Sequence, residues 1–168
     1  MIAKIRSNFK TVSILSKVLL ICTYVFANWK SFAGVMTALT GSAKISTTLL
    51  GCAISGVIVA VVAHFLPKLY LRFAKIYTVP VDEFCLFSTL AWAAYCLMLG
   101  LLNLIYLLAP TFVVLGSVVF PVVSALTAGV CFYAVTSKLY FNDVTRQYYF
   151  RSIGIVILAL AVFAGGVV

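Results

Sequence analysis

The few side chains that could support acid–base chemistry in this sequence lie close to one short basic stretch. The chain has three carboxylates and one histidine, and His64, Asp82 and Glu83 flank the segment from Pro67 to Pro80. A proton relay needs a histidine beside a carboxylate, so a His64–Glu83 pair is one hypothesis. The plainer interpretation places Asp82 and Glu83 in the first turn of a helix that starts near Pro80, where negative charge favours the helix dipole.

No pattern of metal ligands, cofactor-binding residues or activated nucleophiles occurs in the sequence. The cysteines form no CxxC pair and lie in or beside apolar segments, where cysteine behaves as a small hydrophobic residue; they are Cys22, Cys52, Cys85, Cys96 and Cys131. HExxH, GxSxG and a pair of aspartates within an apolar segment are also absent. We therefore expect a protein that is not an enzyme, with no catalytic, cofactor-binding or metal site.

Uncharged polar residues inside the apolar segments are the remaining candidates for chemistry. Thr89, Tyr95, Asn103 and Ser124, with Ser88 beside them, fall within otherwise apolar sequence. They can form hydrogen bonds between helices or line a small polar cavity, and the sequence leaves both interpretations open.

Long apolar segments must position all of these residues. From Phe84 to Ser137 there is no Lys, Arg, Asp, Glu or His, and Ala109-Pro110 divides the run. About 20 helical residues cross a bilayer core, so this run predicts two crossings joined by a tight turn. At 65% hydrophobic residues, 9% charged residues and a mean hydropathy of +1.22, the chain is not a soluble domain. We predict an all-α, polytopic integral membrane helical bundle forming one transmembrane domain over residues 1–168, with five transmembrane helices near 12–32, 45–66, 84–109, 111–137 and 148–168.

Two prolines are expected to shape these helices. Pro67 is predicted to end the second helix, and Pro121 to kink the fourth by removing one backbone hydrogen bond. A kink can act as a gate or can simply improve packing. Packing is favoured here, because no ionisable residue accompanies Pro121.

The distribution of basic residues predicts the orientation. With five crossings, one side holds Lys4, Arg6, Lys10, Lys68, Arg72, Lys75, Lys138, Arg146 and Arg151, and the other side holds Lys30 and Lys44. Short cytoplasmic loops carry the excess of Lys and Arg, so the amino terminus is predicted to be cytoplasmic and the carboxyl terminus to lie on the opposite side. An interfacial first helix and a cleaved signal peptide over residues 1–30 are the alternatives.

Two sets of residues are candidates for contacts. Small residues four apart let helix backbones approach closely in lipid; the candidate helix-contact residues are Gly51, Ser55, Ala125, Gly129, Ala161 and Gly165, and Cys52 with Gly56 has the same spacing. Basic residues beside the spans can hold the connections against anionic phospholipid or an acidic partner; they are Lys68, Arg72, Lys75, Lys138, Arg146 and Arg151. The net charge of +9 is explained by orientation rather than by nucleic-acid binding.

The topology and one short motif resemble the Yip family of five-span membrane proteins and its bacterial relatives. The similarity covers roughly residues 45–168 and rests on Leu90-Ala91-Trp92-Ala93-Ala94-Tyr95, the turn at Pro110 and a short last span. The sequence departs from the family pattern at Cys96-Leu97-Met98, where the family often has a proline. The resemblance implies membrane trafficking with prenylated small GTPases for eukaryotic members, and for bacterial relatives only an integral membrane protein.

Three functional classes are therefore expected, in decreasing order of preference. The first is a non-enzymatic accessory subunit, scaffold or trafficking factor that works by helix–helix contact, with membrane lipids and a protein partner or a second copy as its partners. The second is a small transporter or channel, and the third is a membrane immunity protein.

Overall fold

Four α-helices make up the described part of the chain. The computed structural model describes residues 8–42, 44–73, 79–108 and 119–140. Within these ranges there is no strand, and the helices are α2 (Phe9–Thr40), α3 (Ile45–Phe73), α4 (Val81–Leu108) and α5 (Phe120–Tyr140). The predicted all-α fold class is confirmed for this part of the chain.

Three of the helices are long and apolar enough to cross a membrane. They are α2, α3 and the Val81–Ile105 part of α4, whereas α5 provides a shorter apolar helix, Phe120–Thr136. The predicted count of five crossings is therefore not reached by the described residues. The predicted span at 148–168, the turn at Ala109-Pro110 and the start of the predicted span at 111–137 lie outside them.

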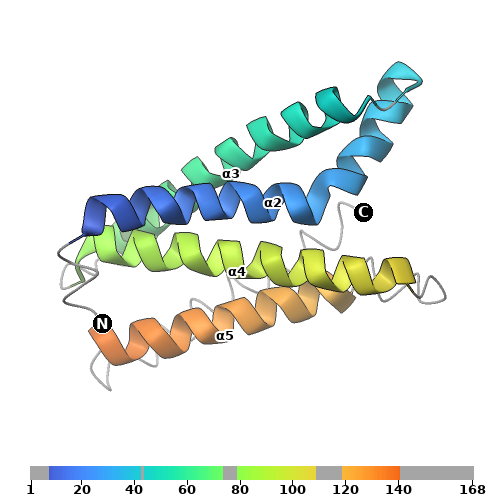
Figure 1. The fold of residues 1–168 in the computed structure, drawn as a ribbon. Helices are drawn as coiled ribbons and strands as arrows, with labels where there is room; N and C mark the ends of the chain where they lie inside the picture. The colour runs from blue at the N-terminus through green and yellow to red at the C-terminus, as the bar shows by residue number, and fades with distance from the viewer. Residues whose placement is uncertain (1–7, 43, 74–78, 109–118, 141–168) are drawn as a thin grey trace.

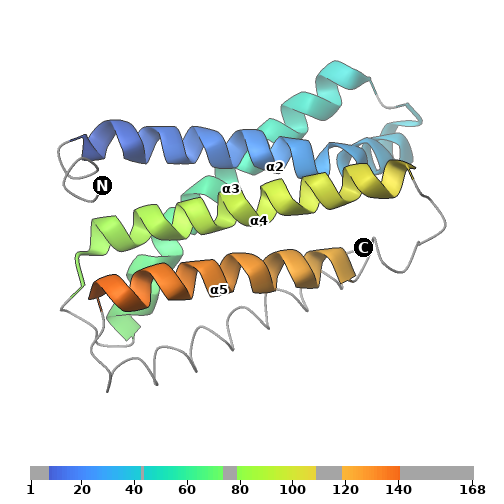
Figure 2. The ribbon, with the colours of Figure 1, turned by 60° about the horizontal axis from the view of Figure 1, so that its bottom comes forward.

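Helix α4 occupies the centre of the bundle. It packs against α2, α3 and α5, and α2 also packs against α3. In the apolar windows of α2, α3 and α4 the buried shares are 17%, 22% and 39%, so α4 is the most enclosed of the three. Successive helices run in opposite directions, which brings the start of α2, the end of α3, the start of α4 and the end of α5 to one end of the bundle (Figures 1 and 2).

Helix α2 is longer than the predicted span at 12–32. Lysine is a good helix former, so Lys10, Lys17 and Lys30 do not interrupt the helix. Gly41 ends it: this residue has a left-handed φ of 73°, and its N–H donates to the Thr37 carbonyl at 2.9 Å. At 1.5 Å per residue, 32 residues extend about 48 Å, well beyond a hydrocarbon core of about 30 Å. Figure 1 shows that the second half of α2 changes direction.

The prediction that Pro67 ends the second helix is wrong. Helix α3 continues through this buried proline to Phe73. Proline removes one N–H from the helix, so the carbonyl of Ala63, four residues earlier, loses its usual donor. The Ser88 hydroxyl of α4 donates to that carbonyl at 3.3 Å, which compensates for the loss from outside the helix.

The remaining helix starts follow familiar rules. Asp82 and Glu83 lie in the first turn of α4, as predicted, and the Phe84 N–H donates to the Pro80 carbonyl at 3.1 Å. Pro121 lies in the first turn of α5, a position where a missing N–H removes no intrahelical hydrogen bond. Residues 111–118, before its predicted kink, lie outside the described part of the chain.

Two clusters of buried residues hold the helices together. In the first, small and apolar residues of α2, α3 and α4 meet; they are Leu20, Ala27, Ala60, Ala63, Ala93 and Cys96. In the second, Leu71 of α3 packs with Val79 and Phe84, and Phe132 of α5 joins them. The rings of Phe84 and Phe132 meet edge to face with centroids 5.3 Å apart.

Candidate functional site

A stripe of small residues on α3 faces the rest of the bundle. Every third or fourth residue is buried, and the stripe comprises Thr48, Cys52, Gly56, Ala60, Ala63 and Pro67. A Cβ at Gly56 would lie 3.3 Å from Cδ1 of Tyr24 and 3.6 Å from the Ile21 Cα, both on α2. Because a backbone atom is among these neighbours, the backbones of α3 and α2 lie close together at Gly56.

The predicted helix-contact residues do not lie in this stripe. Gly51 and Ser55 are half-buried on α3, and a Cβ at Gly51 would meet only the Phe32 ring, at 3.4 Å. On α5, Ala125 is half-buried and Gly129 is buried. Ala161 and Gly165 lie outside the described residues. The more deeply packed pair on α3 is Cys52 with Gly56, which shares the same spacing.

The contact between α2 and α4 involves two residues that the sequence did not single out. Gly100 of α4 is buried, and a methyl group in its place would overlap the ring of Phe26 on α2. Three residues further along α4, the Asn103 side-chain amide donates to the Ala27 carbonyl at 3.2 Å. One glycine and one amide thus set both the distance and the register between these helices. No local pattern indicates this, because Phe26 and Gly100 are far apart in the sequence.

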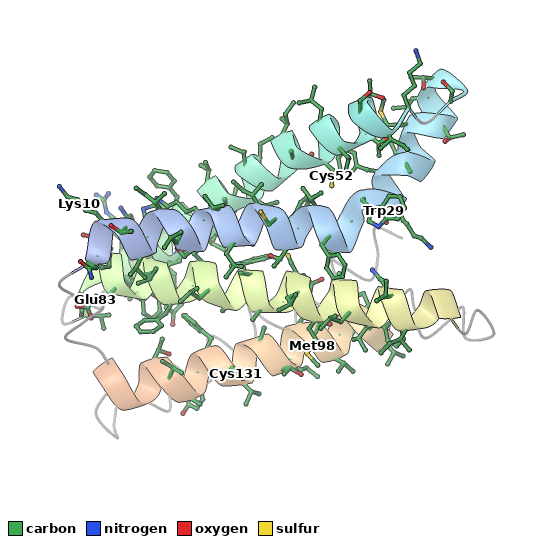
Figure 3. All side chains as sticks on the ribbon, in the orientation of Figure 1. Lys10, Trp29, Cys52, Glu83, Met98 and Cys131 are labelled. Carbon is green, nitrogen blue, oxygen red and sulfur yellow. The ribbon has the colours of Figure 1, made fainter. Side chains whose placement is uncertain are left out.

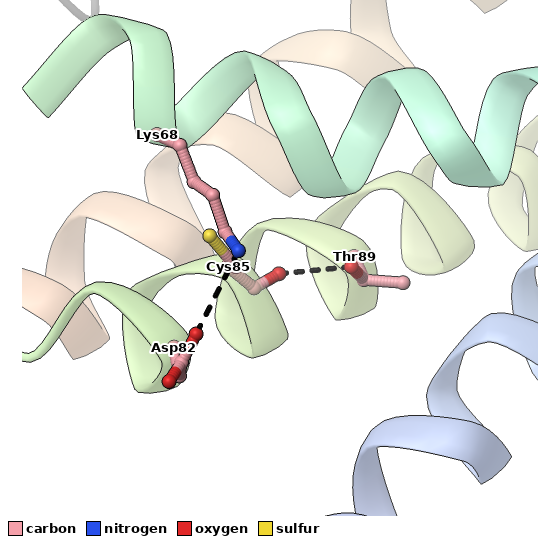
Figure 4. Close-up of polar contacts among 4 residues, drawn as sticks. All are labelled: Lys68, Asp82, Cys85 and Thr89. Carbon is pink, nitrogen blue, oxygen red and sulfur yellow. Dashed lines mark hydrogen bonds and ion pairs between the residues drawn. The ribbon is translucent and has the colours of Figure 1, made fainter.

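The polar residues of α4 are used within the bundle. The Thr89 hydroxyl, almost fully buried, donates to the Cys85 carbonyl of its own helix at 2.8 Å (Figure 4). The Ser88 and Asn103 side chains donate to carbonyls of α3 and α2, as described above. The ring of Tyr95 meets that of Trp92 edge to face, with centroids 6.1 Å apart. These contacts favour the interhelical hydrogen-bonding interpretation over a polar lining.

Two buried hydroxyls have no hydrogen-bond partner within the described residues. They belong to Ser124 of α5, whose exposure is 0%, and Thr48 of α3, whose exposure is 3%. Each lies on a helical segment, where its own helix offers a carbonyl to which the hydroxyl can turn.

Charged residues gather at the end of the bundle where α2 begins, α3 ends and α4 begins. Figure 3 shows Lys10 and Glu83 at this end. The Lys68 ammonium lies 3.8 Å from the Asp82 carboxylate (Figure 4). It also lies 5.7 Å from the centre of the Phe65 ring. The Lys68 and Asp82 side chains are 37% and 72% exposed, so this ion pair is a weak one.

The other predicted basic contacts are only partly described. Arg72 is exposed in the last turn of α3. The side chain of Lys138 is not among those described, and Lys75, Arg146 and Arg151 lie outside the described residues. His64, the other half of the hypothetical relay, is half-buried, and its ring lies edge to face against Phe65 at 5.6 Å. At this end the structure places the Asp82 carboxylate against the Lys68 ammonium.

An open hollow of about 320 Å³ lies beside these charges. Its lining is Phe9, Pro80, Val81, Asp82 and Glu83. Phe9 comes from the start of α2, and the others come from the start of α4.

The cysteines are free thiols, and no metal centre is formed by the described residues. Cys52, Cys85 and Cys96 are buried, and Cys22 and Cys131 are exposed. Nowhere in the described ranges do three His, Cys, Asp or Glu side chains come together closely enough to hold a metal ion.

No known protein family, curated protein or solved structure matches this chain. The Yip resemblance therefore stays a prediction.

Proposed function

We propose that this chain is an integral membrane protein that works by lateral helix–helix contact, as an accessory subunit, scaffold or trafficking factor rather than as an enzyme. In the proposed arrangement the chain crosses the bilayer five times, with a cytoplasmic amino terminus. The crossings include α2, α3 and α4, with α5 and the apolar stretch at 153–168 as the remaining two.

One observation carries this proposal: polar side chains of α4 are bonded to helix carbonyls inside the bundle. Asn103 donates to α2, Ser88 donates to α3 and Thr89 donates within α4. A transport pathway needs polar groups directed toward water, because hydrocarbon cannot satisfy the hydrogen bonds of a polar solute. Side chains already engaged with helix carbonyls support a bundle built for packing.

The outer face of α3 supports the same proposal. Large apolar residues on this face are exposed, among them Leu50, Ile54, Ile58, Phe65 and Phe73. Such a face is suited to lipid or to an apolar partner helix. The basic residues Lys68 and Arg72 at its end are suited to an anionic leaflet, where each contributes on the order of 1 kcal/mol.

Co-purification tests the proposal. The chain is extracted in a mild detergent, and the masses and stoichiometry of the particles are measured. A stoichiometric partner chain supports the accessory-subunit or scaffold class. A homo-oligomer that passes a polar solute when it is reconstituted in vesicles supports the transporter alternative and contradicts the proposal.

Paired substitutions separate the two classes further. Replacing Asn103 and Ser124 by Ala should leave partner binding nearly intact, with a loss of about 1 to 2 kcal/mol from the interhelical hydrogen bond of Asn103. Charge reversal in Arg72→Glu with Arg146→Glu should weaken attachment to the leaflet or to an acidic partner. Loss of function from the first pair alone, in correctly inserted protein, would contradict the scaffold class.

A further inference from the structure

Basic side chains of two neighbouring helices converge near the charged end of the bundle. We propose that Lys17 of α2 and His64 of α3, with Lys68 beside them, bind the phosphate group of an anionic phospholipid. This inference rests on the proposed placement of the chain in a bilayer and adds a specific lipid site to it. It does not depend on which protein partner the chain has.

The first step is the register between the two helices. Helices α2 and α3 run in opposite directions (Figure 1), and a Cβ at Gly56 of α3 would lie 3.3 Å from Cδ1 of Tyr24 on α2. His64 lies about two turns from Gly56 toward the charged end, and Lys17 lies about two turns from Tyr24 toward the same end. The two side chains are therefore near the same level. The Lys17 and Lys68 charges both act on His64, which agrees with this register.

The second step is the face on which each side chain lies. Lys17 precedes Ile21 by four residues and Tyr24 by seven, so it shares their face of α2, the face that meets α3. Lys17, His64 and Lys68 are each half-buried. Each is thus partly enclosed by the bundle and still leaves part of its surface open to a ligand.

The third step is the charge of this group. The Asp82 carboxylate lies 3.8 Å from the Lys68 ammonium, and among the ion pairs of the described residues none includes Lys17. Asp82 also acts on His64, but its side chain is 72% exposed and therefore largely solvated. An unpaired cation near hydrocarbon gains from an anionic neighbour, because little water is present to solvate it. Neutral His64 adds one N–H donor, so a phosphate can accept from both Lys17 and His64.

The fourth step is depth in the proposed bilayer. Lys17 lies about 12 Å from the start of α2, and His64 lies about 14 Å from the end of α3, at 1.5 Å per residue. The headgroup region on each side of the hydrocarbon core is about 5 to 8 Å thick. Both residues therefore lie near the boundary between hydrocarbon and headgroups, where a lysine side chain extends outward to the level of the phosphates.

The fifth step is the apolar surface that continues from this site. Val61 and Val57 precede His64 by three and seven residues, so they lie deeper on the same face of α3. Their exposed fractions are 51% and 49%. The acyl chain of a bound lipid can cover these side chains, whereas a soluble phosphate compound leaves them uncovered. This surface favours a phospholipid as the ligand.

Native mass spectrometry of the full chain, released from detergent micelles, measures the binding. The probes are phosphatidylglycerol and phosphatidylcholine with the same acyl chains. The wild type should bind the first phosphatidylglycerol at least threefold more tightly than phosphatidylcholine. Lys17→Met should weaken binding of phosphatidylglycerol roughly three- to tenfold, because one basic group near the phosphate is lost. His64→Ala should weaken it roughly two- to fivefold, because one hydrogen-bond donor is lost.

Two control variants make the test specific to this site. Lys10 is an exposed lysine of α2 at the same end of the bundle (Figure 3), so Lys10→Met removes the same charge from outside the site and should change binding less than about twofold. Lys17→Arg keeps the charge and should stay within about twofold of the wild type. Equal losses from Lys10→Met and Lys17→Met would show a general attraction to the basic end and would overturn the site.

Glycerol 3-phosphate, a headgroup fragment without acyl chains, distinguishes a lipid from a soluble ligand. It should not displace phosphatidylglycerol when both are present at the same concentration. Displacement at equal concentration would assign the site to a soluble phosphate compound and contradict the lipid. A wild type with no preference for phosphatidylglycerol would also overturn the inference, and this comparison does not depend on how any variant folds.

Alkaline carbonate extraction of membranes separates failure of this inference from failure of the proposed function. The wild type and each variant should stay in the membrane pellet. A chain that stays there but shows no lipid preference contradicts the phosphate site alone. A wild type released into the supernatant contradicts the proposed membrane function and the site together.

Discussion

The ring of Phe26 on α2 occupies the space that a side chain at position 100 of α4 would take. With the Phe26 ring in this position, only glycine fits at position 100. It lies one turn from the Asn103 hydrogen bond to Ala27, so packing and hydrogen bonding act on the same short stretch of α4.

Gly100→Ala should destabilise the protein because the added methyl group displaces the Phe26 ring. The ring is 39% exposed and has room to move outward, so we expect a loss of about 1 to 3 kcal/mol in the free energy of unfolding. Unfolding in mixed micelles of a mild detergent and sodium dodecyl sulfate measures it. Gly34→Ala is the matched control, since nothing lies within 4 Å of a Cβ at Gly34. Adding Phe26→Ala should recover part of the loss; no recovery would mean that the clash is elsewhere.

Gly56→Ala and Gly51→Ala should have opposite effects on stability. Alanine is the better helix former by about 1 kcal/mol, so Gly51→Ala, which meets only the Phe32 ring, should be neutral or stabilising. At Gly56 the new methyl group meets Tyr24 and the Ile21 backbone, so a net loss is expected. The same mixed-micelle unfolding measures both variants. Equal behaviour of the two would show that the stripe on α3 does not pack closely on α2.

Asn103→Ala should weaken the attachment of α4 to α2. One interhelical hydrogen bond contributes about 0.6 to 2 kcal/mol, and the variant should lose that much in the free energy of unfolding. Asn28→Ala is the control, because the Asn28 amide donates within α2, to the Tyr24 carbonyl at 3.0 Å. If Asn28→Ala lowered the free energy of unfolding more than Asn103→Ala does, the α2–α4 hydrogen bond would have no special role in stability.

The proposed orientation predicts which end of the bundle is reached from outside the cell. In Ser42→Cys the thiol lies beside the turn between α2 and α3, and in Arg72→Cys it lies at the charged end; both positions are exposed. A membrane-impermeant maleimide applied to intact cells should modify the first and not the second. The unsubstituted chain measures the background from Cys22 and Cys131. Equal labelling of both positions would contradict the orientation.

The local features of the fold could be predicted from the sequence. Apolar length indicates the helices, and Pro80 with Asp82 and Glu83 marks the start of α4. The end of α3 could not be predicted, because a proline is expected to stop a helix unless another element supplies the missing donor. That donor, Ser88, is separated from Ala63 by a connection whose path the sequence does not indicate.

The sequence also could not show which small residues lie in the helix contacts. Spacing alone ranks Gly51 with Ser55 equal to Cys52 with Gly56, because both pairs are four residues apart. Which pair is buried depends on the rotation of α3 against α2, and that rotation follows from side chains such as Tyr24 and Ile21 on the partner helix. Cys96 and Gly100 have the spacing of Cys52 with Gly56, so the sequence does mark Gly100 as a possible contact residue, but it does not indicate Phe26 as its neighbour.

The central position of α4 also has a consequence for the order in which the chain is made. Helices α2 and α3 leave the ribosome before α4, yet the donors for the carbonyls of Ala27 and Ala63 are Asn103 and Ser88 on α4. In a nascent chain that stops before residue 88, α2 and α3 are present but Ser88 is not. The Ala63 carbonyl then lacks both the helical N–H that Pro67 cannot supply and the hydroxyl from α4. Such an intermediate favours a polar neighbour, whether water or the insertion machinery, until α4 arrives and completes the pair.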